Sequence, residues 1–391
     1  MTTMNAKKWT FGFVFLIILC LLFIAGANYF IDPYGYFSAQ KGENYSMDEE
    51  DYLREQKAEH IKYHADDYDA YLVGGSKAGA IHSDKLSEID GYRYYNCWLL
   101  SGNFEDYYAY SKYIIETAHP KKILLHISTS EIAQFDREAK GDIYEVPAVM
   151  SGESKTAEVF KFLFKNLSVS YDTITNTDPV YPVLSTGERN LTKYYNYYNG
   201  HHDTEDYYNY LMKAQVDPYL PRLTNGTKDK ADLVNSNLDY LKKIKKLCDK
   251  NDVELQVFLG TLFIGEMVGY EGNSFYNWLS EMVDITGGLW CFNNYNDLVY
   301  NPFNYYNARH YYFEMGDLMI DRMSGKAVGY DDFGVYLTPE NIGDEIALRR
   351  KKTDEIREYY KKTGTIPLSD FNDPSNIAKD AENLRTQTEN E

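Results

Sequence analysis

The pattern of hydrophobic and polar residues divides the chain into one long apolar run near the N-terminus and a later series of short apolar runs. Amphipathic stretches with helical periodicity separate the short runs, which are typical of buried strands. We expect strands at 68–73, 93–99, 122–127, 253–259 and 289–292, and helices at 105–118, 235–251 and 274–283. Strands that alternate with helices predict an α/β fold in three layers, with a parallel sheet covered by helices on both faces.

The long apolar run, residues 9–31, contains no charged residue. A helix of that length spans about 30 Å, enough to cross the core of a bilayer. Lys7 and Lys8 precede it and acidic residues dominate soon after it, so the positive-inside rule places residues 1–8 in the cytoplasm and the rest of the chain outside the cell. We expect an uncleaved, single-pass anchor in the cell membrane. A cleaved signal peptide is the alternative, since residues 25–27 (AGA) resemble a cleavage site.

The remainder of the chain is expected to fall into three parts. Residues 32–65 are a charged linker or helical stalk, and residues 66–345 form the sheet domain. A tyrosine-rich insertion without clear periodicity interrupts that domain at about 137–235. Residues 346–391 comprise a charged helix and, from Pro367, a polar acidic tail that we expect to be disordered.

Composition narrows the function classes. The chain of 391 residues has 40 Lys and Arg against 59 Asp and Glu, a formal charge of −19, which argues against nucleic acid as a partner. The mean hydropathy of −0.53 argues against a protein with several membrane spans. The four cysteines show no CxxC spacing, and no histidine and carboxylate set has the spacing of metal ligands, so we expect neither a metal nor another cofactor.

The first junction between strand and helix carries the candidate chemistry. Ser76 follows Gly74 and Gly75 at the end of the first predicted strand, and ligands bind beyond the carboxyl ends of the strands in an open α/β sheet. The residues after Ser76 can start a helix whose N-terminal amides would stabilise an oxyanion. By itself this pattern also fits a phosphate loop or a simple turn, although the spacing GxxxxGK[ST] is missing.

A serine nucleophile needs a base, and His310 is the strongest candidate among eight histidines. It lies in a loop just before an amphipathic stretch at 314–320. A loop so late in the chain can return to the carboxyl edge of the sheet.

Three short motifs in this order resemble the SGNH (GDSL-like) hydrolase superfamily: GGS at 74–76, SGN at 101–103 and NARHYYFEMGDLMIDRM at 307–323. With the N-terminal anchor, the chain is most similar to the membrane-anchored extracytoplasmic branch that includes the DltD-type teichoic acid D-alanylation proteins and the AlgJ/AlgX-type polysaccharide O-acetylation proteins. The resemblance covers about residues 65–130 and 250–325 and implies an SGNH-like, flavodoxin-like sheet. The tyrosine-rich insertion is unmatched.

The resemblance implies a role for individual residues. Ser76 takes the nucleophile position and, with Gly102, supplies backbone amides to the oxyanion. His310 takes the position of the general base. The third conserved block of the superfamily has no evident asparagine here, and Asn103 or Ser128 is the candidate for its polar contact. We also expect Lys77, Ser128 and Tyr311 to contact substrate.

Asn307 occupies the place of the usual aspartate. Its amide can accept a hydrogen bond from the histidine ring, but it cannot offset the charge of an imidazolium. Either activity is reduced, or another carboxylate such as Asp297 assists.

The resemblance implies a serine acyl esterase or O-acyltransferase that modifies a cell-envelope polysaccharide or teichoic acid by acetyl or D-alanyl transfer, beside a membrane-bound O-acyltransferase. The alternative is a catalytically impaired adaptor that binds a glycan or the partner transferase. The tyrosine clusters either form a platform on which sugar rings stack or reflect only a bias in composition.

Overall fold

The computed structural model describes residues 6–42, 52–133, 146–152, 154–176, 185–195, 198, 200–225 and 236–379. The chain forms two compact units: unit 1 comprises Met1–Ala65 and Ala139–Ser185, and unit 2 comprises Asp66–Glu138 and Thr186–Glu391. The stretch at 137–235, which we expected to be one insertion in the sheet domain, is therefore divided between the two units. Its first half belongs with the N-terminal segment.

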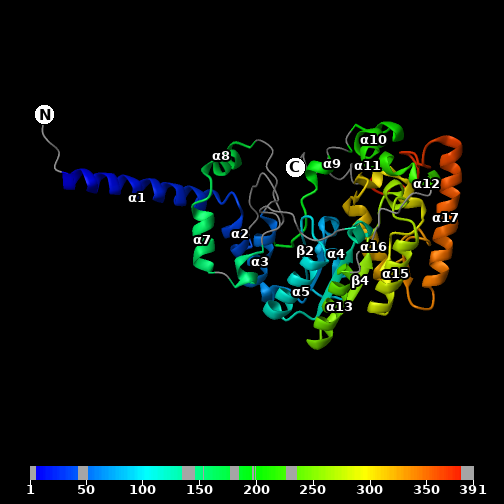
Figure 1. The fold of residues 1–391 in the computed structure, drawn as a ribbon, viewed down its shortest axis with the longest axis horizontal. Helices are drawn as coiled ribbons and strands as arrows, with labels where there is room; N and C mark the ends of the chain where they lie inside the picture. Colours follow the sequence, from blue (N-terminus) through cyan, green and yellow to red (C-terminus); the bar gives the residue numbers. More distant parts are fainter. Residues whose placement is uncertain are drawn as a thin grey trace. The chain divides into compact units, whose positions relative to one another are not determined.

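Unit 1 contains the apolar helix α1 (Ala6–Ile31; Figure 1), which is long and apolar enough to cross a membrane and has none of its most apolar stretch buried. At its end, the Asn28 side chain donates to the carbonyls of Leu163 and Lys165, each at 3.0 Å, and accepts from Ser170 at 2.7 Å. These contacts fix the end of α1 to a small group of helices in unit 1, which we call the cap.

The cap is held together by aromatic rings. Tyr34, Tyr36 and Phe162 form its core, and the Tyr36 and Phe162 rings stack with centroids 4.3 Å apart. Its helices are α2 (Tyr36–Lys41), α3 (Leu53–Tyr63), α6 (Ala148–Ser151), α7 (Lys155–Leu163) and α8 (Leu167–Thr175).

Unit 2 is built on a six-stranded sheet with the order β2-β1-β3-β4-β5-β8. The first five strands pair in parallel and β8 joins the edge antiparallel. Because the chain order reverses between β1 and β3, the topological switch point, where α/β sheets bind ligands, lies between these two strands. The strands are β1 (Ala70–Gly74), β2 (Tyr94–Trp98), β3 (Lys122–Ile127), β4 (Glu254–Leu259), β5 (Leu289–Cys291) and β8 (Val335–Leu337).

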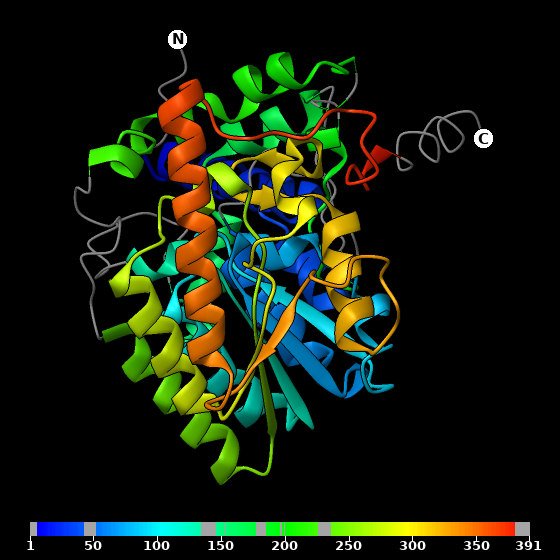
Figure 2. The ribbon, with the colours of Figure 1, turned by 90° about the vertical axis from the view of Figure 1, so that its right-hand side faces the viewer.

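Helices cover both faces of the sheet, as Figure 2 shows. On one face α5 (Phe104–Ala118) packs on β1 and on α13 (Ser236–Lys250), which in turn packs on α15 (Asn273–Thr286). On the other face lie α4 (Ser83–Leu86) and α16 (Phe313–Met323). The remaining helices are α9 (Thr192–Tyr195), α10 (Thr204–Leu211), α11 (Lys213–Val216), α12 (Arg222–Asn225), α14 (Ile264–Met267) and α17 (Ile342–Thr363).

The five expected strands and three expected helices are confirmed, with ends that differ by up to three residues, and so is the α/β class. The sequence analysis missed β8, an edge strand with only one fully buried residue, Leu337, which does not appear as a long apolar run.

The chain from Pro367 differs from the disordered tail that we expected. Ser375 accepts from the side-chain amide of Asn301 at 3.0 Å, and its carbonyl accepts from that of Asn304 at 2.7 Å. The Phe371 ring also packs on that of Phe303, with centroids 5.0 Å apart. The segment is therefore held by amide side chains and one aromatic ring, and a polar acidic sequence does not reveal such packing. Residues 380–391 lie outside the described residues.

Candidate active site

Ser76 follows β1 directly, at the switch point of the sheet. The chain turns there because Gly74 and Gly75 leave room for it: a Cβ atom on Gly74 would lie 2.9 Å from the Cβ of His126 on the neighbouring β3. Residues after the turn form only a single 3₁₀ turn, η2 (Ser76–Ala80), rather than the α-helix that we expected to start there. A strong helix dipole is therefore absent from this end of η2.

Ser76 and His310 meet across 234 residues of sequence. The Ser76 Oγ lies 2.8 Å from His310 Nε2, and His310 Nδ1 lies 3.0 Å from Asn307 Oδ1. Both distances are in hydrogen-bond range, so the three side chains form a serine–histidine–asparagine relay. The structure thus brings together the three residues that were predicted to be catalytic.

The short turn between β6 (Tyr305–Asn307) and β7 (His310–Tyr311) fixes the histidine. Asn307 Oδ1 accepts from the backbone N–H of Arg309 at 3.0 Å and of His310 at 3.1 Å, besides the ring. Because two backbone N–H groups donate to it, this atom is the amide oxygen, and the ring nitrogen that faces it, Nδ1, therefore carries the ring proton. Nε2 is then free to accept the Ser76 hydroxyl proton, as a general base must.

The surroundings of His310 keep its ring neutral. Burial, and then the cations Lys77, Arg189 and Arg309, hold the pKa of His310 well below its usual value of about 6.5. Among the described residues, the hydrogen-bond partners of the ring are Ser76 and Asn307. Asp297 is exposed at the start of η6 (Asp297–Tyr300) and is not among the ring's partners.

Lys77 belongs to a buried network beside Ser76. Its Nζ donates to Ser130 Oγ at 2.8 Å, and Ser130 Oγ lies 3.0 Å from Ser128 Oγ. Burial lowers the pKa of Lys77 and raises that of Glu131, while the attraction between the two charges opposes both shifts. Glu131 Oε2 has no hydrogen-bond partner in the described part of the chain.

Arg189 was not predicted from the sequence. Its guanidinium lies over the rings of Trp98 and Tyr194, 5.1 and 5.0 Å from their centroids, and donates to the Tyr306 hydroxyl at 3.3 Å. The Tyr306 ring in turn stacks on the His310 ring with centroids 5.4 Å apart. Arg189 comes from the tyrosine-rich insertion, where the sequence has neither periodicity nor motif to mark it.

Two expected roles, those of Gly102 and Tyr311, are not supported by the geometry. The Gly102 N–H donates to the Leu99 carbonyl at 3.1 Å, so it is already engaged within its own turn. Asn103 caps α5 with its amide oxygen through a reciprocal bond with Asp106, and a contact to an oxyanion would use its Nδ2 group instead, so that role stays a prediction. Tyr311 is fully buried, with its hydroxyl 3.2 Å from His126 Nε2, and faces the core rather than a substrate.

The Ser76 backbone amide has no partner among the described residues, so it remains available to an oxyanion. Within the same described ranges, no group of three or more His, Cys, Asp or Glu side chains is arranged to hold a metal ion.

Comparison of the chain with protein-family models, with curated proteins and with solved structures yields no match. The interpretation of the site therefore depends on its geometry and on the chemistry of its residues.

Proposed function

We propose that this chain is a serine acyl esterase or O-acyltransferase of the SGNH-like type, which modifies a polysaccharide or teichoic acid of the cell envelope. The observation that supports it is the relay of Ser76, His310 and Asn307, with contacts of 2.8 and 3.0 Å at the carboxyl edge of a doubly wound sheet. A serine, a base and a group that orients the base are the parts that nucleophilic acyl transfer requires.

The proposed reaction has two halves. Ser76 Oγ attacks the ester carbonyl while its proton passes to His310 Nε2, which gives an anionic tetrahedral intermediate. The intermediate collapses as Nε2–H protonates the leaving alcohol, and the acyl group remains on Ser76. Water or a sugar hydroxyl then attacks the acyl-enzyme by the same steps in reverse, with His310 as the base and then as the acid.

The intermediate's negative charge has stabilising partners in this site. The free N–H of Ser76 can donate to the oxyanion. The buried ammonium of Lys77, the residue after Ser76, can stabilise its negative charge. The cations at this site also lower the pKa of His310 and make proton transfer to its ring harder. Asn307 does not offset this effect, because a neutral amide cannot stabilise the imidazolium as a carboxylate does. We expect a working but modest catalyst.

The location that we propose for the reaction is supported by α1 and the charges that flank it. We propose that α1 remains as a single-pass anchor with Lys7 and Lys8 in the cytoplasm, and that both units lie outside the cell beside a membrane-bound O-acyltransferase.

One observation favours a second function. The neutral Asn307 and the low pKa of His310 also suit an inactive relay, in a protein that binds a glycan or the partner transferase without chemistry.

Turnover of an activated acetyl ester and of an O-acetylated oligosaccharide distinguishes the two functions. The Ser76→Ala variant should lose both activities and accumulate no acyl-enzyme, whereas Ser87→Ala, which changes a serine at the end of α4, should retain them. If the wild-type protein turns over neither substrate and forms no acyl-enzyme, the acyl-transfer function is wrong and the adaptor function takes its place as the proposal.

A further inference from the structure

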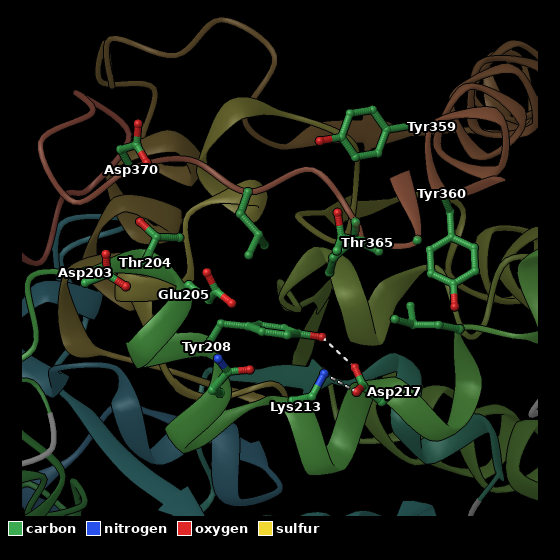
Figure 3. A pocket seen from close by; sticks show the side chains of 15 residues that line it. Asp203, Thr204, Glu205, Tyr208, Lys213, Asp217, Tyr359, Tyr360, Thr365 and Asp370 are labelled. Carbon is green, nitrogen blue, oxygen red and sulfur yellow. Dashed lines mark hydrogen bonds and ion pairs between the residues drawn. The ribbon is translucent and has the colours of Figure 1, made fainter. Parts of the chain in front are cut away.

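A cavity lies in unit 2 apart from the serine relay. The cavity has a volume of about 600 Å³ and lies between α10, η5 (Asp217–Tyr219), the end of α17 and the segment that follows α17 (Figure 3). Its size is within the range of about 300–1,000 Å³ that is usual for small-molecule sites. Leu220 and Ile366 are buried beneath it and provide an apolar floor.

Tyrosines line two sides of this cavity. Tyr208 comes from α10, and Tyr359 and Tyr360 come from the last turns of α17. Tyr359 is 41% exposed, so its ring is open to a ligand, and Tyr208 is held in place by a hydrogen bond of 3.1 Å from its hydroxyl to Asp217 Oδ1. Flat aromatic faces with polar edges suit the ring of a sugar, which is apolar on its faces and polar around its rim.

The polar lining is rich in acceptors. Four carboxylates line the cavity against a single cation, Lys213, and Asp217 neutralises that cation at 2.5 Å. Glu205 and Asp370 form no ion pair with the described residues. Carboxylates accept hydrogen bonds from sugar hydroxyls and attract amines, but they repel carboxylate and phosphate groups. The lining therefore fits neutral or amine-bearing sugars and disfavours anionic ones.

The cavity wall is connected to the catalytic turn. Gln215 lies on α11 between the lining residues Lys213 and Asp217, and its Oε1 accepts from the backbone N–H of Ala308 at 3.2 Å. On α10, Tyr207 precedes the lining residue Tyr208 and donates to the Tyr305 carbonyl at 2.9 Å. Both contacts reach the segment that carries Asn307 and His310, so the helices that line the cavity also pack on the segment that holds the relay.

We propose that this cavity is a glycan subsite that holds neutral or amine-bearing sugars of the acceptor or substrate polymer next to Ser76. The inference rests on the proposed function, since it names the class of polymer that the serine site would modify.

The test is binding of the full chain in detergent to an array of neutral, amine-bearing and uronic-acid oligosaccharides. The protein carries Ser76→Ala, so that turnover does not change the ligands. We expect binding to the neutral and amine-bearing oligosaccharides only. Tyr359→Ala should weaken it about tenfold because one stacking face is lost.

Tyr210→Ala is the matched control. Tyr210 is an exposed tyrosine on the same helix as Tyr208 but does not line the cavity, so this variant should bind as tightly as its parent. No binding to any oligosaccharide, preference for the uronic acids, or equal binding by Tyr359→Ala and Tyr210→Ala would overturn the proposal. Acylation of wild-type Ser76 by an activated ester is measured separately, so failure of the glycan subsite is distinguishable from failure of the serine chemistry.

Discussion

The serine relay and the tyrosine-lined cavity differ most in the sign of their charge. Cations from three different segments, Lys77, Arg189 and Arg309, act on the ring of His310, whereas carboxylates predominate around the cavity. Positive charge is useful where an oxyanion forms, and acceptors are useful where hydroxyl groups bind. The contrast indicates that one part of unit 2 is suited to chemistry and another to holding a polymer.

A comparison of two histidines, His82 and His310, shows which of them is suited to act as the base. His82 has the carboxylate partner that a relay usually provides, Asp317 at 2.9 Å, and that partner raises the pKa of His82 although burial lowers it. His310 has only an amide, but it is the histidine that reaches Ser76. With Ser76 as the proposed nucleophile, proximity to Ser76 rather than a paired carboxylate is our reason to propose His310 as the base.

The largest expected effect is that of His310→Ala. Without the base, the rate of ester turnover should fall by about 10⁴-fold, because the serine hydroxyl is a weak nucleophile until it is deprotonated. His82→Ala is the matched control and should keep the wild-type rate. Steady-state kinetics with a small activated ester measures both, and equal losses in the two variants would contradict the assignment of the base.

Removing the buried charges beside Ser76 should have the next largest effect. In the double variant Lys77→Met/Glu131→Gln neither charge is left buried alone, and kcat should fall by about 10²-fold through weaker stabilisation of the oxyanion. The loss of a cation also raises the pKa of His310, so the acid limb of the pH–rate profile should move to higher pH.

Lys242→Met provides the control for a lost surface cation, since Lys242 pairs with Glu281 on the exposed side of α13. An unchanged kcat and pH profile in the double variant would show that the cations at the site are structural only.

A change in the cavity should affect the kinetics of a polymer substrate and of a small ester differently. Tyr359→Ala should raise KM for an O-acetylated oligosaccharide by about tenfold and leave kcat/KM for a small ester unchanged, because only the longer substrate reaches the cavity. An equal loss of activity on both substrates would show that Tyr359 contributes to the folding of unit 2 and not to binding.

Asn307→Asp should have the smallest effect at alkaline pH. The amide already holds the ring with the proton on Nδ1, so a carboxylate adds only charge, and the rate at pH 8 should rise by about threefold at most. The added charge raises the pKa of His310, which in the wild type lies well below 6.5. The wild type should therefore stay active at pH 6, where the variant begins to lose activity.

The hydrophobic pattern predicted most of the sheet, because β1 and β3 are buried on both faces and β4 is buried over its last three residues, so that each appears as a short apolar run. Ser76 and His310 could be predicted because short motifs mark them. The place of Arg189 could not be predicted, because it approaches through tertiary packing of a segment without periodicity. The engagement of the Gly102 amide could not be predicted either, because it depends on the exact turn geometry.

The most direct test of the central claim is reaction of the full chain with a fluorophosphonate probe, followed by mapping of the modified residue by mass spectrometry. The probe reacts with a serine only when a neighbouring base activates the hydroxyl. The relay of 2.8 and 3.0 Å predicts one adduct, on Ser76, which is abolished in His310→Ala and retained in His82→Ala. An unlabelled Ser76 in the folded wild-type protein would contradict the account.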